Sequence, residues 1–152
     1  MKYTPRKRTL GRRAKANDAA HRRDWQAILA RQNWTCAGCG ARDVALQDAH
    51  LAGRPGSGAT LGPWANAPEL RVALCCADPA KGTLGCHERL DRGLDPALQD
   101  RLRRAGAEAL AARINAPECF SLRPSVDPLD AIRYLVRLAE ERHIPEPGED
   151  NS

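Results

Sequence analysis

The chain has 152 residues, of which 42% are hydrophobic and only 4% aromatic, so it is long enough for one modest domain with appendages but not for two full cores. No stretch approaches the roughly 20 apolar residues that a membrane span needs, and the charged N-terminus is not followed by the apolar segment of a secretory signal. We therefore expect a cytoplasmic protein with no membrane partner, in which paired cysteines are metal ligands before they are disulfides.

The formal net charge is +5 and is unevenly distributed. Basic residues crowd the first 23 positions, where Asp18 is the only acid, whereas residues 145–152 form an acidic tail. An arginine-rich arm is typical of proteins that contact phosphate backbones, although a merely solubilising tail has the same composition. We expect residues 1–17 to be a flexible basic arm. The candidate nucleic-acid contacts are Arg6, Lys7, Arg8, Arg12, Arg13 and Arg54.

Hydrophobic periodicity begins after this arm. A helix that starts near Asp18, a possible cap, is predicted because Trp25, Ile28 and Leu29 follow the i, i+3, i+4 spacing of an amphipathic helix. It leads into Cys36-Ala37-Gly38-Cys39-Gly40, whose small residues suit a zinc knuckle. Gly38 and Gly40 permit the positive φ that turns backbone amides towards thiolate sulfurs.

Two strands and a short helix are predicted next. Residues 44–51 alternate, with Val44, Leu46, Asp48 and His50 on one side and Ala45, Gln47 and Ala49 on the other. Residues 52–68 are rich in Gly and Pro and predict a long loop, which in a compact domain is usually functional. Residues 69–75 predict the second strand, residues 77–85 an irregular excursion, and residues 86–93 a short helix that ends at Gly93.

Two longer helices are predicted from repeated Asp-Pro starts, in which the aspartate caps and the proline occupies the first turn. The first runs from Asp95-Pro96 to about Ile114, and the second from Asp127-Pro128 to about His143. Their predicted apolar faces are Leu98, Leu102, Ala105, Ala109 and Ala112 in the first, and Ile132, Leu135, Val136 and Ala139 in the second. We expect residues 18–93 to hold a helix and a zinc-containing core, and residues 94–144 to be a helical extension.

The cysteines have the spacing of a tetrahedral zinc site, with two pairs separated by a few tens of residues. Cys36, Cys39 and Cys86 are expected ligands, and either Cys75 or Cys76 would be the fourth. His87 could instead complete a site of three cysteines and one histidine. Cys119 lies outside the pattern and is expected to be a small core residue.

Together these residues resemble the HNH endonucleases, in the zinc-stapled form common in phages and bacteria. The resemblance covers about residues 33 to 93 and consists of Cys36-x-x-Cys39, a strand ending in His50, a Gly-rich loop, a strand ending in Leu74-Cys75, and Cys86-His87. It implies an α+β fold with a small zinc-stabilised ββα-metal (HNH) core and flanking α-helices. It also implies Cys75 as the fourth zinc ligand.

The resemblance implies roles for two histidines. His50 stands where the family has its general base, which deprotonates the water that attacks the scissile phosphate, and an imidazole suits this task because its pKa lies near neutrality. His87 stands where the family has a ligand of the catalytic Mg²⁺ or Mn²⁺. From the residues alone, the alternative is that His50 merely fills a strand surface.

Two positions depart from the family pattern. The residue before the base is commonly a metal-binding Asp or His but here is Ala49, so the nearby Asp48 is the candidate ligand, with an ordinary strand-end acid as the alternative. The family asparagine falls on Leu70, so Asn66 is expected to orient the base, unless it is a simple turn residue.

The resemblance implies a metal-dependent DNA endonuclease, a phosphodiester hydrolase that acts in a bacterial host cell and is encoded by the bacterium or by a phage. The alternative is a non-catalytic zinc module that binds nucleic acid. A third interpretation is an adaptor whose C-terminal helices dock a larger nuclease or terminase, and it predicts an exposed apolar face from Leu129 to Ala139.

Overall fold

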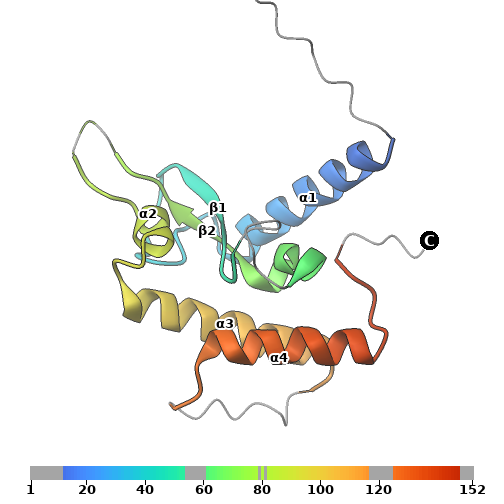
Figure 1. Cartoon of the computed structure of the whole chain (residues 1–152). Helices are drawn as coiled ribbons and strands as arrows, with labels where there is room; N and C mark the ends of the chain where they lie inside the picture. The colour runs from blue at the N-terminus through green and yellow to red at the C-terminus, as the bar shows by residue number, and fades with distance from the viewer. Residues whose placement is uncertain (1–11, 54–60, 79, 81, 117–124, 148–152) are drawn as a thin grey trace, which may run out of the picture.

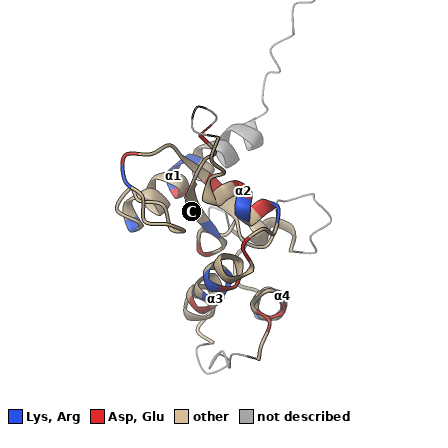
Figure 2. Ribbon diagram, turned by 90° about the vertical axis from the view of Figure 1, so that its left-hand side faces the viewer, with Lys and Arg blue, Asp and Glu red and all other residues tan. Residues whose placement is uncertain are grey.

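The computed structural model describes residues 12–53, 61–78, 80, 82–116 and 125–147. Over these residues the fold is α+β, with a two-stranded antiparallel sheet, four α-helices and two short 3-10 helices. Helices α3 (Pro96–Arg113) and α4 (Pro128–Glu141) lie side by side beneath the strands in Figure 1, and Figure 2 shows the pair end on. The predicted α+β class is therefore confirmed.

The sheet is a pair of five-residue strands, β1 (Leu46–His50) and β2 (Arg71–Cys75), with Leu46 opposite Cys75 and His50 opposite Arg71. The predicted alternation holds within β1, where Ala49 is fully buried and its neighbours Asp48 and His50 are only partly covered. Ala49 packs in a cluster with residues of α2 (Cys86–Asp91) and α3, whereas Ala73 of β2 packs against helix α1 (Arg12–Arg31) on the opposite face. Each face of the small sheet is thus covered by helix.

Helix α1 begins at Arg12, earlier than the predicted start near Asp18. Asp18 lies inside the helix and is not its cap. The sequence from Arg12 to Ala16 consists of arginine, alanine and lysine, which are strong helix formers, so the helix extends without a capping residue at Asp18. Its C-terminal half contacts the sheet through Ile28 and Leu29, as the periodicity predicted.

The predicted loop of residues 52–68 is more ordered in its second half than composition suggested. It contains the 3-10 helices η1 (Gly62–Asn66) and η2 (Pro68–Leu70), each with a proline in its first turn. Trp64 is fully buried in the core that α3 and α4 share with this segment. A large aromatic side chain therefore anchors the connection between the two strands.

Both predicted aspartate caps are confirmed. Asp95 accepts a hydrogen bond from the backbone N–H of Leu98 at 3.0 Å, and Asp127 accepts one from that of Leu129 at 3.2 Å. The predicted face of α3 is only partly correct, because Leu98 and Leu102 are buried but Ala105, Ala109 and Ala112 are exposed. The buried stripe continues instead through Gly106, Ala107, Leu110 and Ala111.

Gly106 explains this difference. A Cβ at this position would lie 2.9 Å from Leu51 Cδ1 and 3.0 Å from the carbonyl oxygen of Glu69, so α3 approaches the end of the hairpin at its glycine. This contact fixes the rotation of the helix and turns the three alanines outward.

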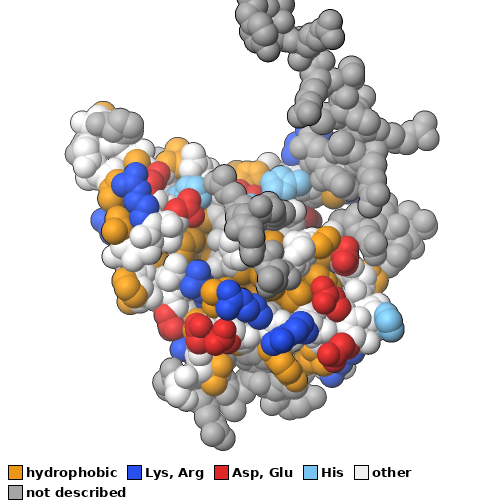
Figure 3. Space-filling view, viewed as in Figure 1, with side chains coloured by type: hydrophobic (Ala, Val, Ile, Leu, Met, Phe, Trp, Pro, Cys, Tyr) orange, Lys and Arg blue, Asp and Glu red, His pale blue; other side chains and the backbone are white. Residues whose placement is uncertain are grey.

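The predicted apolar face of α4 packs inward. Ile132, Leu135, Val136 and Ala139 are all buried against α3, because an aliphatic stripe gains most free energy where it is removed from water. The adaptor interpretation predicted that this apolar face would be exposed, and that prediction is therefore wrong. Basic and acidic side chains are interspersed on the face that α3 and α4 present in Figure 3. Among the described helices, none is long and apolar enough to cross a bilayer.

Candidate metal centre and adjoining histidines

Four cysteines from three separate segments meet at one point. Cys36 and Cys39 lie in the turn after α1, Cys75 ends β2, and Cys86 begins α2. One sulfur from each lies within 4.8 Å of all the others, and the sulfurs of Cys39 and Cys75 are 3.9 Å apart. Tetrahedral Zn²⁺ with bonds of about 2.3 Å to sulfur places its ligands roughly 3.8 Å apart, so the cluster fits a zinc ion.

Backbone amides point at these sulfurs. Cys36 Sγ accepts from the N–H groups of Gly38 and Cys75, and Cys75 Sγ accepts from that of Cys86, each at 3.3 Å. Amide donors of this kind stabilise thiolates and orient metal ligands. The knuckle and the start of α2 are therefore shaped to hold negative sulfur.

The surroundings of the cluster lower the pKa of one thiol and raise the pKa of two others. Burial alone would raise the pKa of Cys36, but the amides of Cys39, Cys75 and Gly38 outweigh it and lower this pKa to about 7. Burial next to the other sulfurs raises the pKa of both Cys75 and Cys86. The Cys36 thiol thus ionises readily, whereas the raised pKa values of Cys75 and Cys86 oppose ionisation of these two thiols, a conflict that a bound divalent cation removes.

Gly38 is needed for a different reason from the predicted one. Positive φ occurs at Gly40 (74°), whereas at Gly38 the constraint is space, because a Cβ there would lie 2.7 Å from Cys86 Sγ. The predicted turning of backbone amides towards sulfur holds for the segment, but Gly38 itself is needed because the absence of a side chain makes room for the sulfur of Cys86.

The choice between neighbouring cysteines is settled by position. Cys75 belongs to the cluster and Cys76 does not, nor does His87. Burial, with a smaller contribution from the charge of Glu88, raises the pKa of the Cys76 thiol. Among the described residues, the candidate zinc site is therefore made of four cysteines, and the arrangement with three cysteines and His87 is not formed.

His50 and Asn66, the two predicted catalytic residues, lie together. His50 ends β1, Asn66 ends η1, and His50 Nε2 is 3.0 Å from Asn66 Oδ1. An amide oxygen only accepts, so in this orientation Nε2 carries the proton and Nδ1 is the unprotonated nitrogen. Nδ1 is buried in this structure.

Asp48, the predicted second metal ligand, is bound by an arginine. Nε of Arg71 lies 3.2 Å from each oxygen of Asp48, and its Nη2 lies 2.7 Å from Oδ2. His21 of α1 adds a contact of 3.3 Å to the same Oδ2. A metal ion at Asp48 would have to compete with this guanidinium, so metal binding by Asp48 stays a prediction.

His87 has an acidic neighbour, Asp91, that is not among the residues predicted from the sequence. Its Nε2 lies 3.6 Å from Oδ2 of Asp91, one turn along α2. The His87 side chain is 10% exposed and that of Asp91 is 51% exposed, so the pair opens to solvent at the carboxylate. The signal was available, because residues at i and i+4 share a helix face.

The remaining predicted site residues are not placed. Arg6, Lys7, Arg8 and Arg54, as well as Cys119, lie outside the described residues. Arg12 and Arg13 begin α1, and only their backbone is described.

Comparison with known proteins gives no relative. Neither a family model, nor a curated protein, nor a solved structure matches this chain.

Proposed function

We propose that this chain is a metal-dependent DNA endonuclease whose hairpin and following helix form an HNH-type ββα-metal core stapled by zinc. The observation that carries the proposal is the hydrogen bond between His50 and Asn66 at the end of the hairpin. This pair adjoins a strand that ends in one zinc-site cysteine and leads to a helix that begins with another, Cys75 and Cys86.

In this proposal His50 is the general base. Asn66 holds the Nε2–H tautomer, so Nδ1 accepts the proton of the water molecule that attacks the scissile phosphate. Because Nδ1 is buried, the proposal requires this atom to become accessible when nucleic acid binds.

His87 and Asp91 are the residues that would hold Mg²⁺ or Mn²⁺. They offer one imidazole nitrogen and one carboxylate oxygen on a single helix face, and a site with few protein ligands suits a metal whose shell is completed by phosphate and water. Such a metal ion, when bound, supplies positive charge to the phosphoryl transition state and to the departing oxygen.

The cysteine cluster has a structural role in the proposal. Cys86 and His87 are consecutive, so zinc at Cys86 fixes the first turn of α2 and with it the imidazole of His87. Structural zinc sites of this kind contribute directly to folding free energy.

A plasmid-nicking assay with Mg²⁺ or Mn²⁺ tests the proposal. We expect His50→Ala to reduce cleavage by about 10²- to 10⁴-fold, the usual range for loss of a general base, with zinc content unchanged. His143→Ala is the matched control, because His143 is an exposed histidine after α4. Equal cleavage by wild type and His50→Ala would refute the proposed role.

A second function is supported by two observations. Ala49 offers no ligand atom, and the carboxylate of Asp48 is already bound by Arg71. Both favour a non-catalytic zinc module that binds nucleic acid. This alternative predicts DNA binding without cleavage under either metal, so the same assay combined with a binding measurement distinguishes it from the nuclease.

A further inference from the structure

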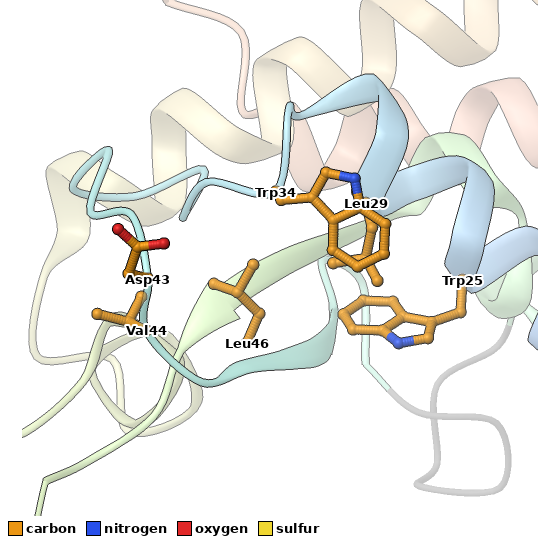
Figure 4. Close-up of a pocket in the computed structure, with 6 residues that line it drawn as sticks. All are labelled: Trp25, Leu29, Trp34, Asp43, Val44 and Leu46. Carbon is orange, nitrogen blue, oxygen red and sulfur yellow. The ribbon is translucent and has the colours of Figure 1, made fainter.

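A pocket of about 370 Å³ opens between the end of α1, the turn that follows it and the segment that enters β1. Figure 4 shows its six lining side chains, which are Trp25, Leu29, Trp34, Asp43, Val44 and Leu46. Trp34 is 56% exposed and Val44 is 42% exposed. Large apolar side chains thus face solvent around a hollow, beside the hairpin but on the face opposite α2.

The backbone holds two of these residues in an unusual conformation. Trp34 has φ 57°, which is rare for a bulky residue, and Asp43 has φ 55° in the same left-handed region. The N–H of Trp34 donates to the carbonyl of Leu29 at 2.9 Å, which closes the end of α1. The indole of Trp34 is therefore presented by a fixed turn.

The pocket has two chemically different ends. Figure 4 shows the two indoles at one end and Asp43 at the other, with Val44 beside Asp43 and Leu46 between the two ends. A ligand that fills the pocket therefore needs an apolar surface for the indoles and a hydrogen-bond donor for the carboxylate. A flat ring system can stack on an indole, lie along the aliphatic side chains and donate an N–H to Asp43.

We propose that this pocket binds an unpaired nucleobase that carries an exocyclic amino group, in a single-stranded or locally opened stretch of the nucleic-acid substrate. Base stacking on aromatic side chains is worth about 1–3 kcal/mol per base, and a carboxylate accepts from amino groups such as N4 of cytosine. The proposal rests on the proposed function for its class of ligand.

Charge and position favour nucleic acid over a peptide. The net charge of +5 attracts a polyanion and repels the basic peptide that Asp43 would otherwise select. Leu46 shares a sheet face with His50, four residues along β1, which is roughly 14 Å at about 3.4 Å per residue. This distance corresponds to about four nucleotide steps of 3.4 Å, so one strand can reach both places.

Binding of labelled oligonucleotides, without added Mg²⁺ or Mn²⁺, tests the proposal. Single strands of dC, single strands of dT and abasic strands of equal length are compared by fluorescence anisotropy. We expect Trp34→Ala to weaken binding of the dC strand by roughly 5- to 150-fold and to leave the abasic strand unchanged. Trp34→Phe should restore much of the loss, and Asp43→Asn should remove the preference for dC over dT.

Tyr134→Ala is the control for loss of an exposed aromatic side chain, since Tyr134 is 48% exposed on α4. Zinc content shows that each variant keeps the knuckle. Any of three results would overturn the pocket proposal. They are equal effects of Trp34→Ala and Tyr134→Ala, equal wild-type binding of abasic and dC strands, and displacement of the bound dC strand by an apolar peptide alone. If plasmid nicking persists in those cases, the proposed function stands. If wild type binds neither single nor double strands, both proposals fail.

Discussion

Arg71 and Asp48 form a nearly enclosed ion pair within the hairpin. The Arg71 side chain is fully buried, and that of Asp48 is 20% exposed. Arg71 lies directly opposite His50 across the strands, so its guanidinium reaches diagonally to Asp48. From α1, Asp24 adds an ion pair at 3.7 Å. A buried cation with two carboxylates therefore joins the helix to the strand that carries the candidate base.

Asp48→Ala should destabilise the fold. Removing one partner of a buried pair leaves an uncompensated charge and typically costs about 3–5 kcal/mol, and Asp24 together with the partial exposure of Asp48 should reduce this to about 2–3 kcal/mol. Urea unfolding of the zinc-loaded protein measures the change. Asp130→Ala is the control, because its pair with Arg133 is exposed and should contribute less than about 1 kcal/mol.

The adjacent cysteines should behave differently on substitution. Cys75→Ser removes a ligand of the cluster and should abolish stoichiometric zinc binding, whereas Cys76→Ser should keep one zinc per chain. Apparent zinc-binding free energies are on the order of 10 kcal/mol, similar to the whole stability of a small domain, so the Cys75 variant should also unfold around the hairpin. Elemental analysis and circular dichroism of the two variants give the comparison; equal zinc content would contradict the assignment.

Zinc affinity should fall as the pH falls, with a break near neutrality. In the metal-free protein the lowered pKa of Cys36, about 7, means that this thiol is ionised above pH 7 and takes up a proton below it. Zinc must displace that proton, so the logarithm of the affinity should fall about one unit per pH unit more steeply below pH 7. Competition with a chromogenic chelator between pH 6 and 8 measures both slopes. A constant slope would contradict the ionisation of Cys36.

The parts of the fold that the sequence predicted are set by local signals. Cysteine spacing, the Asp95 and Asp127 caps and the alternation in β1 each depend on a few consecutive residues. The predicted face of α3 was only half right, since alanines such as Ala105 fit either side of a helix. The contact of Gly106 with Leu51 and Glu69 decides between them, and it joins segments distant in sequence.

The sequence predicted the residues of the candidate site but not all of their contacts. The sequence singled out His50 and Asn66, which the structure brings within hydrogen-bonding distance. It did not reveal that Asp48 is bound by Arg71, because that contact depends on strand register and on the approach of α1. Residues with catalytic or metal-binding side chains were therefore easier to predict than the side chains with which they form hydrogen bonds and ion pairs.

The place where a catalytic metal ion binds should be visible in the Mg²⁺ dependence of cleavage. If His87 and Asp91 hold it, Asp91→Asn should raise the Mg²⁺ concentration needed for half-maximal plasmid nicking by at least about tenfold, since even outer-shell partners of metal ligands are worth 10- to 100-fold in affinity. His87→Ala should have a larger effect.

Asp100→Asn is the matched control, because Asp100 is also a partly exposed helical acid, paired with Arg104 one turn along α3. Its metal dependence should equal that of wild type. Asp48→Ala is the decisive comparison. A shifted metal requirement in Asp48→Ala, with normal stability and with Asp91→Asn unaffected, would place the metal ion at Asp48 and require Arg71 to release its carboxylate. A loss of stability in Asp48→Ala with an unchanged metal requirement would leave Asp48 as the partner of a buried arginine and the metal ion on α2.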